Sequence, residues 1–194
     1  MNFNLVMKEE MREHMLMMEE LEKNDLPAVE TAGKHLYECL SNGNKILVAG
    51  NGGSAADSQH FTAELIGRFS TNRRALAALA LTTDTSAITA ISNDFTYDHV
   101  FSRQVEGLGQ KGDAFIAIST SGNSMNLVKA LEMAHKKGMH TIALLGKTGG
   151  KMAGLASESI IVPSSTTQRI QEAHEWILHT WCAYLDWSVS EEDS

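Results

Sequence analysis

A glutamate and a histidine in one predicted helix have residue types and spacing suited to proton transfer. Glu64 follows His60 by four residues, so both side chains lie on one face of the helix predicted over 54–68. This helix begins directly after a glycine-rich loop, and its first turns therefore face the same crevice as that loop. A carboxylate can remove a proton from carbon and return it, while histidine titrates in the range needed to exchange protons with oxygen.

A second group of polar and titratable residues lies in the segment RIQEAHEWILH, within a helix predicted over 167–187. Its members are Gln171, Glu172, His174 and His179. A lone histidine is more often packed or at the surface than a functional ligand, so four other histidines are assigned no function. These are His14, His35, His135 and His140.

Two loops rich in glycine and hydroxyl side chains follow predicted strands. The first, Gly50-Asn51-Gly52-Gly53-Ser54, allows close backbone approach, and Ser54 can cap the following helix. The second, Ser119-Thr120-Ser121-Gly122-Asn123-Ser124, places four hydroxyls at a helix N-terminus, where a phosphate or sugar hydroxyls can bind. An ordinary turn needs fewer glycines, and a helix cap needs one hydroxyl. Together the loops favour a small anionic ligand rich in hydroxyl groups.

The first loop also matches a loose dinucleotide-binding pattern, Gly50-x-Gly52-x-x-Ala55, between a strand and a helix. Proteins of that kind place an acidic residue about 20 residues further on to bind the ribose. Residues 70–74 contain no carboxylate, and Asp84 lies later. A hydride-transfer function would also leave the second loop without a role, so this interpretation is the weaker alternative.

Short apolar runs alternate with helical patterns after residue 43, which is typical of a parallel sheet covered by helices on both faces. We expect an α/β fold with a parallel five-stranded sheet, preceded by a pair of N-terminal helices. The predicted strands are 45–50, 75–82, 114–120, 141–146 and 159–163. The predicted helices are 3–23, a segment from Pro27 to Leu40, 54–68, 85–107, 123–137 and 167–187.

A single domain over residues 1–194 is expected, because no linker, repeat or low-complexity segment interrupts the chain. Residues 1–41 would serve packing or oligomerisation, and residues 42–187 would form the α/β core and C-terminal helix. The Met-rich helix 3–23 is expected to pack against a partner helix or the chain's own core, in preference to forming a promiscuous binding surface. The acidic residues 188–194 are expected to fray.

Composition and charge narrow the function further. The formal net charge of −8 argues against broad binding of nucleic acid or anionic membranes, so local features such as helix N-termini must hold any anionic ligand. The two cysteines have no paired spacing that predicts a disulfide framework or a thiolate zinc cluster. Charges interrupt the apolar pattern of the N-terminus, unlike a secretory signal, and no apolar run approaches the roughly 20 residues that span a bilayer. We therefore expect a cytoplasmic protein.

Five motifs resemble the phosphoheptose isomerase family of the sugar isomerase (SIS) domain superfamily. They are AGNGGSAADSQHFTAELIGRF, SND, ISTSGNS, GKTGGKMA and RIQEAHEWILH, and the resemblance covers nearly the whole chain. It implies a three-layer, flavodoxin-like fold and a homotetramer with active sites at subunit interfaces. It also implies an intramolecular oxidoreductase that converts sedoheptulose 7-phosphate to D-glycero-D-manno-heptose 7-phosphate through an ene-diol, the first step toward the heptose of lipopolysaccharide.

The resemblance also implies roles for individual residues. Glu64 corresponds to the family's base and His179 to its acid–base histidine. A zinc ion, which would polarise the carbonyl, would be bound by His60, Glu64, Gln171 and His179. The substrate would contact Asn51, Gly52, Gly53, Ser54, Glu64, Asn93, Asp94, Ser119, Thr120, Ser121, Ser124 and Gln171. Glu64 cannot easily be both a tight zinc ligand and a free base, and the sequence does not choose between these roles.

The spacing of Gln171 and His179 predicts a composite site. In a regular helix over 167–187 the two residues are separated by about 12 Å of rise, too far for both to reach one ion from the same helix. One of them is therefore expected from another subunit.

A non-catalytic alternative comes from the same superfamily, a tetrameric binding protein that associates with a replication initiator. The segment SNGNKIL and the acidic tail resemble that protein as well. It lacks the catalytic carboxylate and the distal histidine, whereas this chain has Glu64 and His179, which favours the isomerase. A regulatory sugar-phosphate-binding domain would keep both loops but would not need Glu64 and His179 together.

Overall fold

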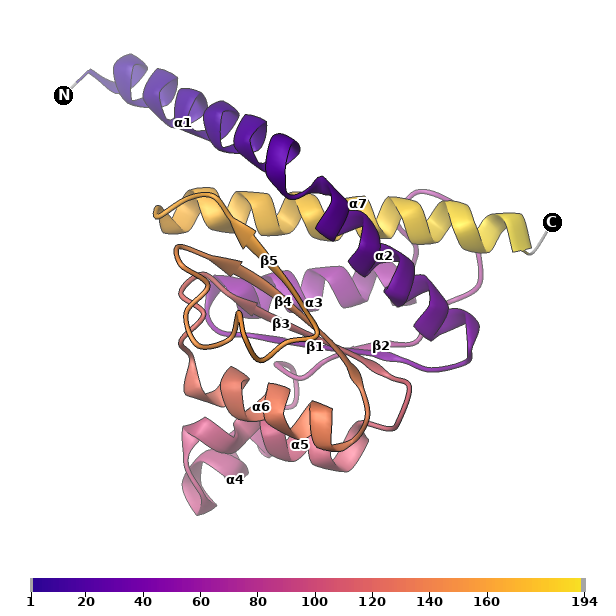
Figure 1. Cartoon of the computed structure of the whole chain (residues 1–194). Coiled ribbons are helices and arrows are strands. Elements are labelled where there is room, and N and C mark those ends of the chain that lie inside the picture. The colour runs from indigo at the N-terminus through magenta and orange to yellow at the C-terminus, as the bar shows by residue number, and fades with distance from the viewer. Residues whose placement is uncertain (1, 193–194) are drawn as a thin grey trace.

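A parallel sheet forms the centre of the computed structural model, which describes residues 2–192 (Figure 1). Within these residues five strands pair in the order β2-β1-β3-β4-β5, and every neighbouring pair is parallel. This is the strand order of flavodoxin-like folds, so the predicted fold class is confirmed. The strands are β1 (Ile46–Gly50), β2 (Ala78–Ala80), β3 (Ala114–Ser119), β4 (His140–Gly146) and β5 (Glu158–Val162).

Helices cover both faces of the sheet, because alternate side chains of each strand point to opposite faces. Ile46 and Val48 of β1 lie in one apolar core, whereas Leu47 and Ala49 lie in the other. Helices α2, α3 and α7 cover the first core, and α4, α5 and α6 cover the second (Figure 1). The helices are α1 (Phe3–Asn24), α2 (Leu26–Ser41), α3 (Gly53–Ile66), α4 (Thr85–Asp94), α5 (Val100–Leu108), α6 (Met125–Lys136) and α7 (Thr167–Glu192), with a 3-10 turn η1 (Tyr97–His99).

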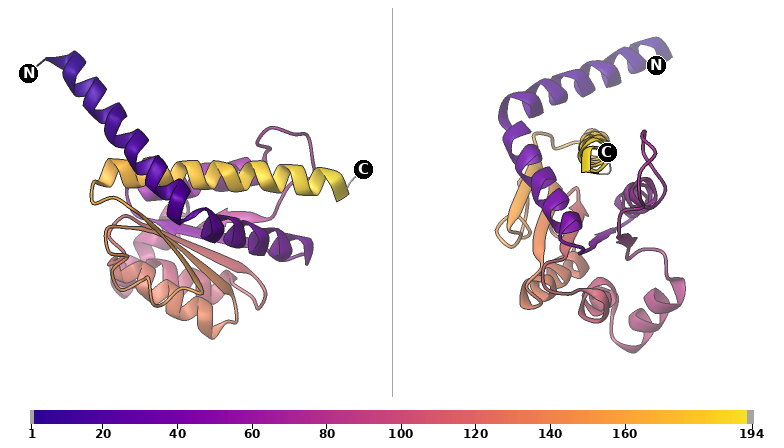
Figure 2. Two further views of the ribbon diagram at one scale, coloured as in Figure 1. Left: turned by 45° about the horizontal axis from the view of Figure 1, so that its top comes forward. Right: turned by 90° about the vertical axis from the view of Figure 1, so that its right-hand side faces the viewer.

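Helix α1 extends beyond the body of the molecule (Figure 2). Its buried residues, Met17 and Leu21, lie toward its C-terminal end and join the first core. Apolar residues nearer its N-terminus are exposed, among them Phe3, Leu5 and Met11. The helix therefore packs on its own chain through one end and leaves the other end of its apolar stripe uncovered.

Three predicted elements differ from the structure. The helix predicted over 85–107 is divided into α4, η1 and α5, because Thr96 is extended and ends the helical path. The strand predicted over 75–82 pairs only over Ala78–Ala80, at the edge of the sheet. The expected fraying from residue 188 was wrong, since α7 continues to Glu192 and Val189 is fully buried in the first core. Residues 193–194 lie outside the described part of the chain.

A buried ion pair ties the loop after α3 to α7. Nε of Arg73 lies 2.6 Å from Oδ1 of Asp186, and the two side chains are 0% and 2% exposed. Oδ2 of Asp186 accepts hydrogen bonds from the backbone N–H groups of Ser70 and Thr71. Burial raises the pKa of Asp186, but these hydrogen bonds and the Arg73 guanidinium outweigh burial, so the net change is a lowered pKa. Arg73 also donates to the backbone carbonyl of Glu64, so the pair supports the end of α3.

Replacing Asp186 with alanine should destabilise the protein strongly, because Arg73 would stay buried without its partner. Breaking a buried pair typically costs about 3–5 kcal/mol of unfolding free energy. Because the pKa of Asp186 is lowered in the folded state, the ionised carboxylate stabilises the fold fully above the unfolded-state pKa, and this stabilisation is lost as the pH falls through the folded-state pKa. Urea denaturation of the wild type and of Asp186→Ala should therefore show a difference in unfolding free energy at pH 7, and this difference should shrink on acidification.

The matched control is Glu132→Gln, a change at an exposed carboxylate on α6 that should leave the unfolding free energy nearly unchanged. An Asp186→Ala variant as stable as the wild type at pH 7 would show that the ion pair does not support the fold.

Candidate active site

A small cavity lies where β1 and β3 end, between the two predicted loops. Its volume is about 110 Å³, and both loops contribute to it together with the first turns of α7. The carboxyl ends of parallel strands are the usual place for a ligand in this kind of sheet. The lining residues are Asn51, Ser54, Ile118, Ser119, Thr120, Ser121, Ser124 and Gln171.

Two helices begin at this cavity, which makes it suited to an anion. Helix α3 starts after Gly52, a glycine with a positive φ of 58° and no capping side chain. Helix α6 starts after Ser124, whose hydroxyl caps no N–H group within the described residues. The first N–H groups of a helix and its dipole attract negative charge. The cavity therefore offers local positive potential on a chain whose net charge is −8.

Hydrogen bonds with Asn126 and Tyr97 hold the side chain of Asn51, in the first loop, in place. Its Oδ1 accepts hydrogen bonds from Nδ2 of Asn126, at 2.9 Å, and from the hydroxyl of Tyr97, at 3.1 Å. Its Nδ2 lies 3.1 Å from Oδ1 of Asn126, which is itself buried at the start of α6. This reciprocal amide pair links the two loops, so they are fixed relative to each other.

Close packing requires a glycine at position 50 and brings a side chain of α7 against position 53. A Cβ on Gly50 would lie 2.3 Å from the carbonyl oxygen of Ser54, a backbone atom that cannot move aside easily. A Cβ on Gly53 would lie 2.2 Å from Nε2 of Gln171, which is the end of a flexible side chain. Gln171 of α7 therefore lies directly against the start of α3.

Two histidines and two glutamates form a cluster further along α3 and α7. Nε2 of His60 lies 2.8 Å from Nε2 of His179, and each of these nitrogens lies 3.2 Å from Oε1 of Glu175. Oε1 of Glu64 lies 3.8 Å from Nε2 of His60, which agrees with their expected position on one helix face. All four side chains are partly exposed, between 24% for Glu64 and 43% for His60, so a ligand can reach them.

Three members of this cluster have the donor atoms of a divalent metal site. The ring nitrogens of His60 and His179 and a carboxylate oxygen of Glu175 all lie within 4.8 Å of one another. Two imidazoles and one carboxylate, with a further position open, form a common donor set for zinc. The residues present therefore fit the predicted metal.

Asp57, one turn before His60, adds a second carboxyl group beside this cluster. Its Oδ2 is buried and has no hydrogen-bond partner among the described residues. Burial, followed by repulsion from Glu175, raises the pKa of Asp57 to about 6, while His60 lowers it. A cation bound at the cluster would favour the ionised form of this carboxyl group, which is a further reason why the cluster fits a metal.

The structure places Gln171 and His179 at different points of one unbroken helix. Gln171 lies at the small cavity and His179 lies beside His60. Glu175, midway between them, contributes the carboxylate of the cluster. Glu175 is not among the site residues predicted from the sequence, although its spacing of four residues from both Gln171 and His179 puts all three on one helix face. A composite site between subunits stays a prediction.

Asn93 and Asp94 are not brought to the cavity within the described residues. They lie at the C-terminal end of α4, where Nδ2 of Asn93 donates to Oδ1 of Asp94. Glu172 is also outside the cluster, since it bonds His14 and Arg169.

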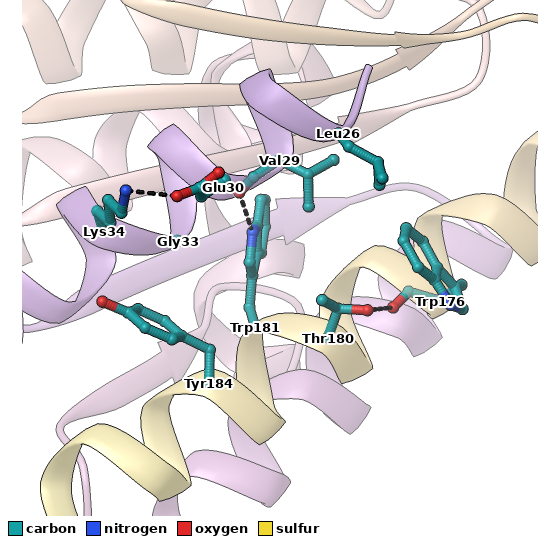
Figure 3. Close-up of a pocket in the computed structure, with 9 residues that line it drawn as sticks. All are labelled: Leu26, Val29, Glu30, Gly33, Lys34, Trp176, Thr180, Trp181 and Tyr184. Carbon is teal, nitrogen blue, oxygen red and sulfur yellow. Dashed lines mark hydrogen bonds and ion pairs between the residues drawn. The ribbon is translucent and has the colours of Figure 1, made fainter. Parts of the chain in front are cut away.

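An apolar groove beside α7 lies away from both the cavity and the His–Glu cluster, and few polar groups line it. It has a volume of about 370 Å³ and separates α2 from α7 (Figure 3). Its charged residues, Glu30 and Lys34, bond each other, and the indole N–H of Trp181 donates to the carbonyl of Val29 (Figure 3). These interactions leave an apolar surface without a convergent set of polar groups, so we assign no catalysis to the groove.

Comparisons with known proteins agree on one family. The family model described as "SIS domain" matches residues 11–146. A phosphoheptose isomerase of Aliarcobacter butzleri is 57% identical over 162 residues, covering 84% of this chain and 86% of the relative. One of Geobacter sp. is 52% identical over 179 residues, with 92% and 93% covered. The solved structure of phosphoheptose isomerase GmhA from Neisseria gonorrhoeae superposes with a TM-score of 0.90 at 45% identity, covering 95% of this chain and 99% of that one.

His174 faces the sheet and acts as a packing residue. It is fully buried, and its Nε2 lies 3.0 Å from the carbonyl oxygen of Leu145 at the end of β4, so the ring N–H donates there. Burial lowers the pKa of His174 to about 4, which keeps the ring neutral near pH 7.

The buried His174 should make the protein sensitive to acid. Because its folded-state pKa of about 4 lies below the usual unfolded value, its neutral ring contributes fully above about pH 6.5. This contribution is lost as the pH falls toward 4, by up to about 3 kcal/mol of unfolding free energy. His174→Gln keeps an amide donor for Leu145 but does not titrate, so urea denaturation between pH 7 and pH 4 should show a shallower pH dependence. If the unfolding free energies of the wild type and of His174→Gln changed equally with pH, titration of the buried His174 would not be the cause of the acid sensitivity.

Proposed function

This chain belongs to the SIS domain family and, within it, to the phosphoheptose isomerases, and we propose that it converts sedoheptulose 7-phosphate to D-glycero-D-manno-heptose 7-phosphate. This reaction is an aldose–ketose isomerisation, and its product would enter the synthesis of the heptose of lipopolysaccharide. One observation carries the proposal: a cavity suited to an anion and a His–Glu cluster lie along the same two helices, α3 and α7.

The phosphate group would bind in the small cavity, between the starts of α3 and α6. Oγ of Ser119 accepts a hydrogen bond from the N–H of Gly122, and Oγ of Ser121 accepts one from the N–H of Asn123. Because these bonds use the oxygens as acceptors, both hydroxyl hydrogens can donate to a phosphate oxygen. The helix N-termini add partial positive charge, which supports binding of a dianion.

Glu64 is proposed as the base at carbon. It would take the proton from C1 of the ketose while the C2 carbonyl oxygen gains a proton, which produces the ene-diol. Returning the carbon-bound proton to C2, with loss of a proton from the oxygen on C1, gives the aldose. Glu64 is supported in this role by its partial exposure and by its place 3.8 Å from His60 in the cluster.

His179 is proposed to move protons between the two oxygens. An imidazole ring can both donate and accept a proton, and the contacts of His179 with His60 and Glu175 hold the ring in one orientation. Each such group typically accelerates a reaction by about 10²–10⁴-fold.

Zinc is proposed to bind at Nε2 of His60 and Nε2 of His179, with Glu175 as the carboxylate ligand, which would leave Nδ1 of His179 to exchange protons. When bound, zinc would polarise the substrate carbonyl. Assigning Glu175 to the metal leaves Glu64 available as the base, which removes the conflict between its two predicted roles. The predicted ligand Gln171 would belong to the site only in a composite arrangement, since it lies at the other cavity in this chain.

A homotetramer is proposed as the assembled form, with the active sites at subunit interfaces. Two uncovered apolar surfaces on each chain support it: the exposed end of α1 and the groove between α2 and α7. A second groove of about 410 Å³, between α1 and α7, shares Leu26 and Trp176 with the first. We propose that helices of another copy cover these surfaces.

We propose that the protein acts in the cytoplasm, where sugar phosphates are made. Among the described residues, none of the helices is long and apolar enough to span a membrane.

Loss of either proposed proton-transfer group should lower turnover strongly. We expect Glu64→Gln and His179→Ala to lower kcat for sedoheptulose 7-phosphate by about 10²–10⁴-fold each. The measurement is the formation of the aldose heptose phosphate by purified, zinc-loaded protein, and Glu132→Gln is the matched control. If the wild type binds the sugar phosphate but forms no product, the non-catalytic binding protein becomes the better interpretation.

Zinc content should separate the two glutamates. Glu175→Gln should reduce the zinc retained after dialysis by one ion per chain, because the amide replaces a charged ligand, whereas Glu64→Gln should keep its zinc and lose turnover. Atomic emission on the dialysed proteins measures the zinc. The opposite pattern, with zinc lost from Glu64→Gln and kept by Glu175→Gln, would assign the ligand to Glu64.

A further inference from the structure

A second cluster of histidine and glutamate lies at the amino ends of the strands, whereas the candidate active site lies at their carboxyl ends. His140 and Glu158 are the first residues of β4 and β5, whereas the active-site loops follow the last residues of β1 and β3. His35 comes from the middle of α2, which packs against β5. Glu158 pairs with Ile142, two residues after His140, so both polar side chains lie on the face that α2 covers.

The three side chains converge on one oxygen atom. Nδ1 of His35 lies 2.5 Å from Oε1 of Glu158, and Nε2 of His140 hydrogen-bonds the same oxygen. The two imidazole ring centroids are 4.5 Å apart. The side chains of His35 and His140 are 39% and 32% exposed, and that of Glu158 is 17% exposed. Solvent therefore reaches a set of donor atoms that come from three different elements of the fold.

We propose that His35, His140 and Glu158 form a second divalent metal site, which binds zinc. Their donor atoms all lie within 4.8 Å of one another. Tetrahedral zinc with bonds of about 2.0–2.2 Å holds its ligand atoms about 3.4 Å apart, so small side-chain movements admit the ion in place of the hydrogen-bonded protons. Two imidazoles and a carboxylate favour zinc over the hard cations magnesium and calcium, which prefer all-oxygen sites. Water reaching the exposed side fills the fourth position.

The nearby thiol of Cys39 is excluded from this site. It is buried one turn after His35, and its Sγ donates to the carbonyl of Lys45. Burial raises the pKa of Cys39 to about 11, and its Sγ is not among the donor atoms that lie within 4.8 Å of one another. The ligand set is therefore two histidines and one glutamate.

The site links α2 to the first residues of β4 and β5, far from the residues assigned to catalysis. An ion that binds only when these three elements are assembled stabilises the folded state by mass action. We therefore assign this metal a structural role, which does not depend on the reaction that the other site performs.

The test is a cobalt(II) and zinc titration of the metal-free full-length protein. We expect two ions per chain in the wild type and in Glu132→Gln, and one in Glu158→Gln. The Glu158→Gln variant keeps the size and hydrogen bonding of the side chain, so it should fold, and circular dichroism checks this. It should also keep its turnover, while Glu175→Gln loses the other ion. The zinc-dependent rise in Tm should be smaller in Glu158→Gln than in the wild type.

Nitrogen NMR of the histidine rings provides a second, residue-specific readout. Zinc should shift the resonances of Nδ1 of His35 and Nε2 of His140 in the wild type, and the shifts should disappear in Glu158→Gln. A Glu158→Gln variant that binds the same number of ions as the wild type, or His35 and His140 resonances that do not respond to zinc, would overturn the proposal.

Discussion

The position of helix α7 against the sheet is the constraint on which the rest of the structure depends. Three interactions fix it along its length: His174 bonds the end of β4, Trp181 bonds α2, and Asp186 pairs with Arg73 beyond α3. Each joins buried polar groups that would be costly to leave unpaired, so the helix cannot slide or rotate without losing several of them. The same helix then presents Gln171, Glu175 and His179 to α3 at intervals of about one turn.

An acidic protein that binds an anionic sugar must create positive potential locally. The parallel sheet does this by ending β1 and β3 beside each other and starting α3 and α6 from the same place. The glycines allow the backbone to approach, and the amide pair of Asn51 and Asn126 locks the two loops together. The proposed anion site therefore follows from the topology and from backbone N–H groups, with no need for a basic side chain. The proposed proton-transfer groups, Glu64 and His179, lie further along α3 and α7, where an extended sugar phosphate would reach them.

Much of this arrangement could be predicted from the sequence because it depends on local patterns. The alternation of apolar runs with helical segments gave the correct fold class, and the two loops were correctly expected at strand ends. The i, i+4 spacing correctly placed His60 and Glu64 on one face. Other features depend on tertiary packing and were missed. The contact between Glu175 and His60 joins two helices that are distant in sequence, and nothing local marks the break at Thr96 as stronger than the surrounding helical pattern. The convergence of His35, His140 and Glu158 also depends on tertiary packing, and the sequence around each residue does not mark it as part of a cluster.

The central claim is that this chain moves a proton between neighbouring carbons of a sugar phosphate. The most direct test is to incubate it with sedoheptulose 7-phosphate in deuterium oxide and follow deuterium at C1 and C2 by NMR. Deuterium should enter these positions in the wild type, because a proton held by a partly exposed carboxylate exchanges with solvent. No deuterium should enter them in Glu64→Gln. A wild-type protein that forms no aldose and exchanges no hydrogen at carbon, or deuterium incorporation that persists in Glu64→Gln, would contradict this claim.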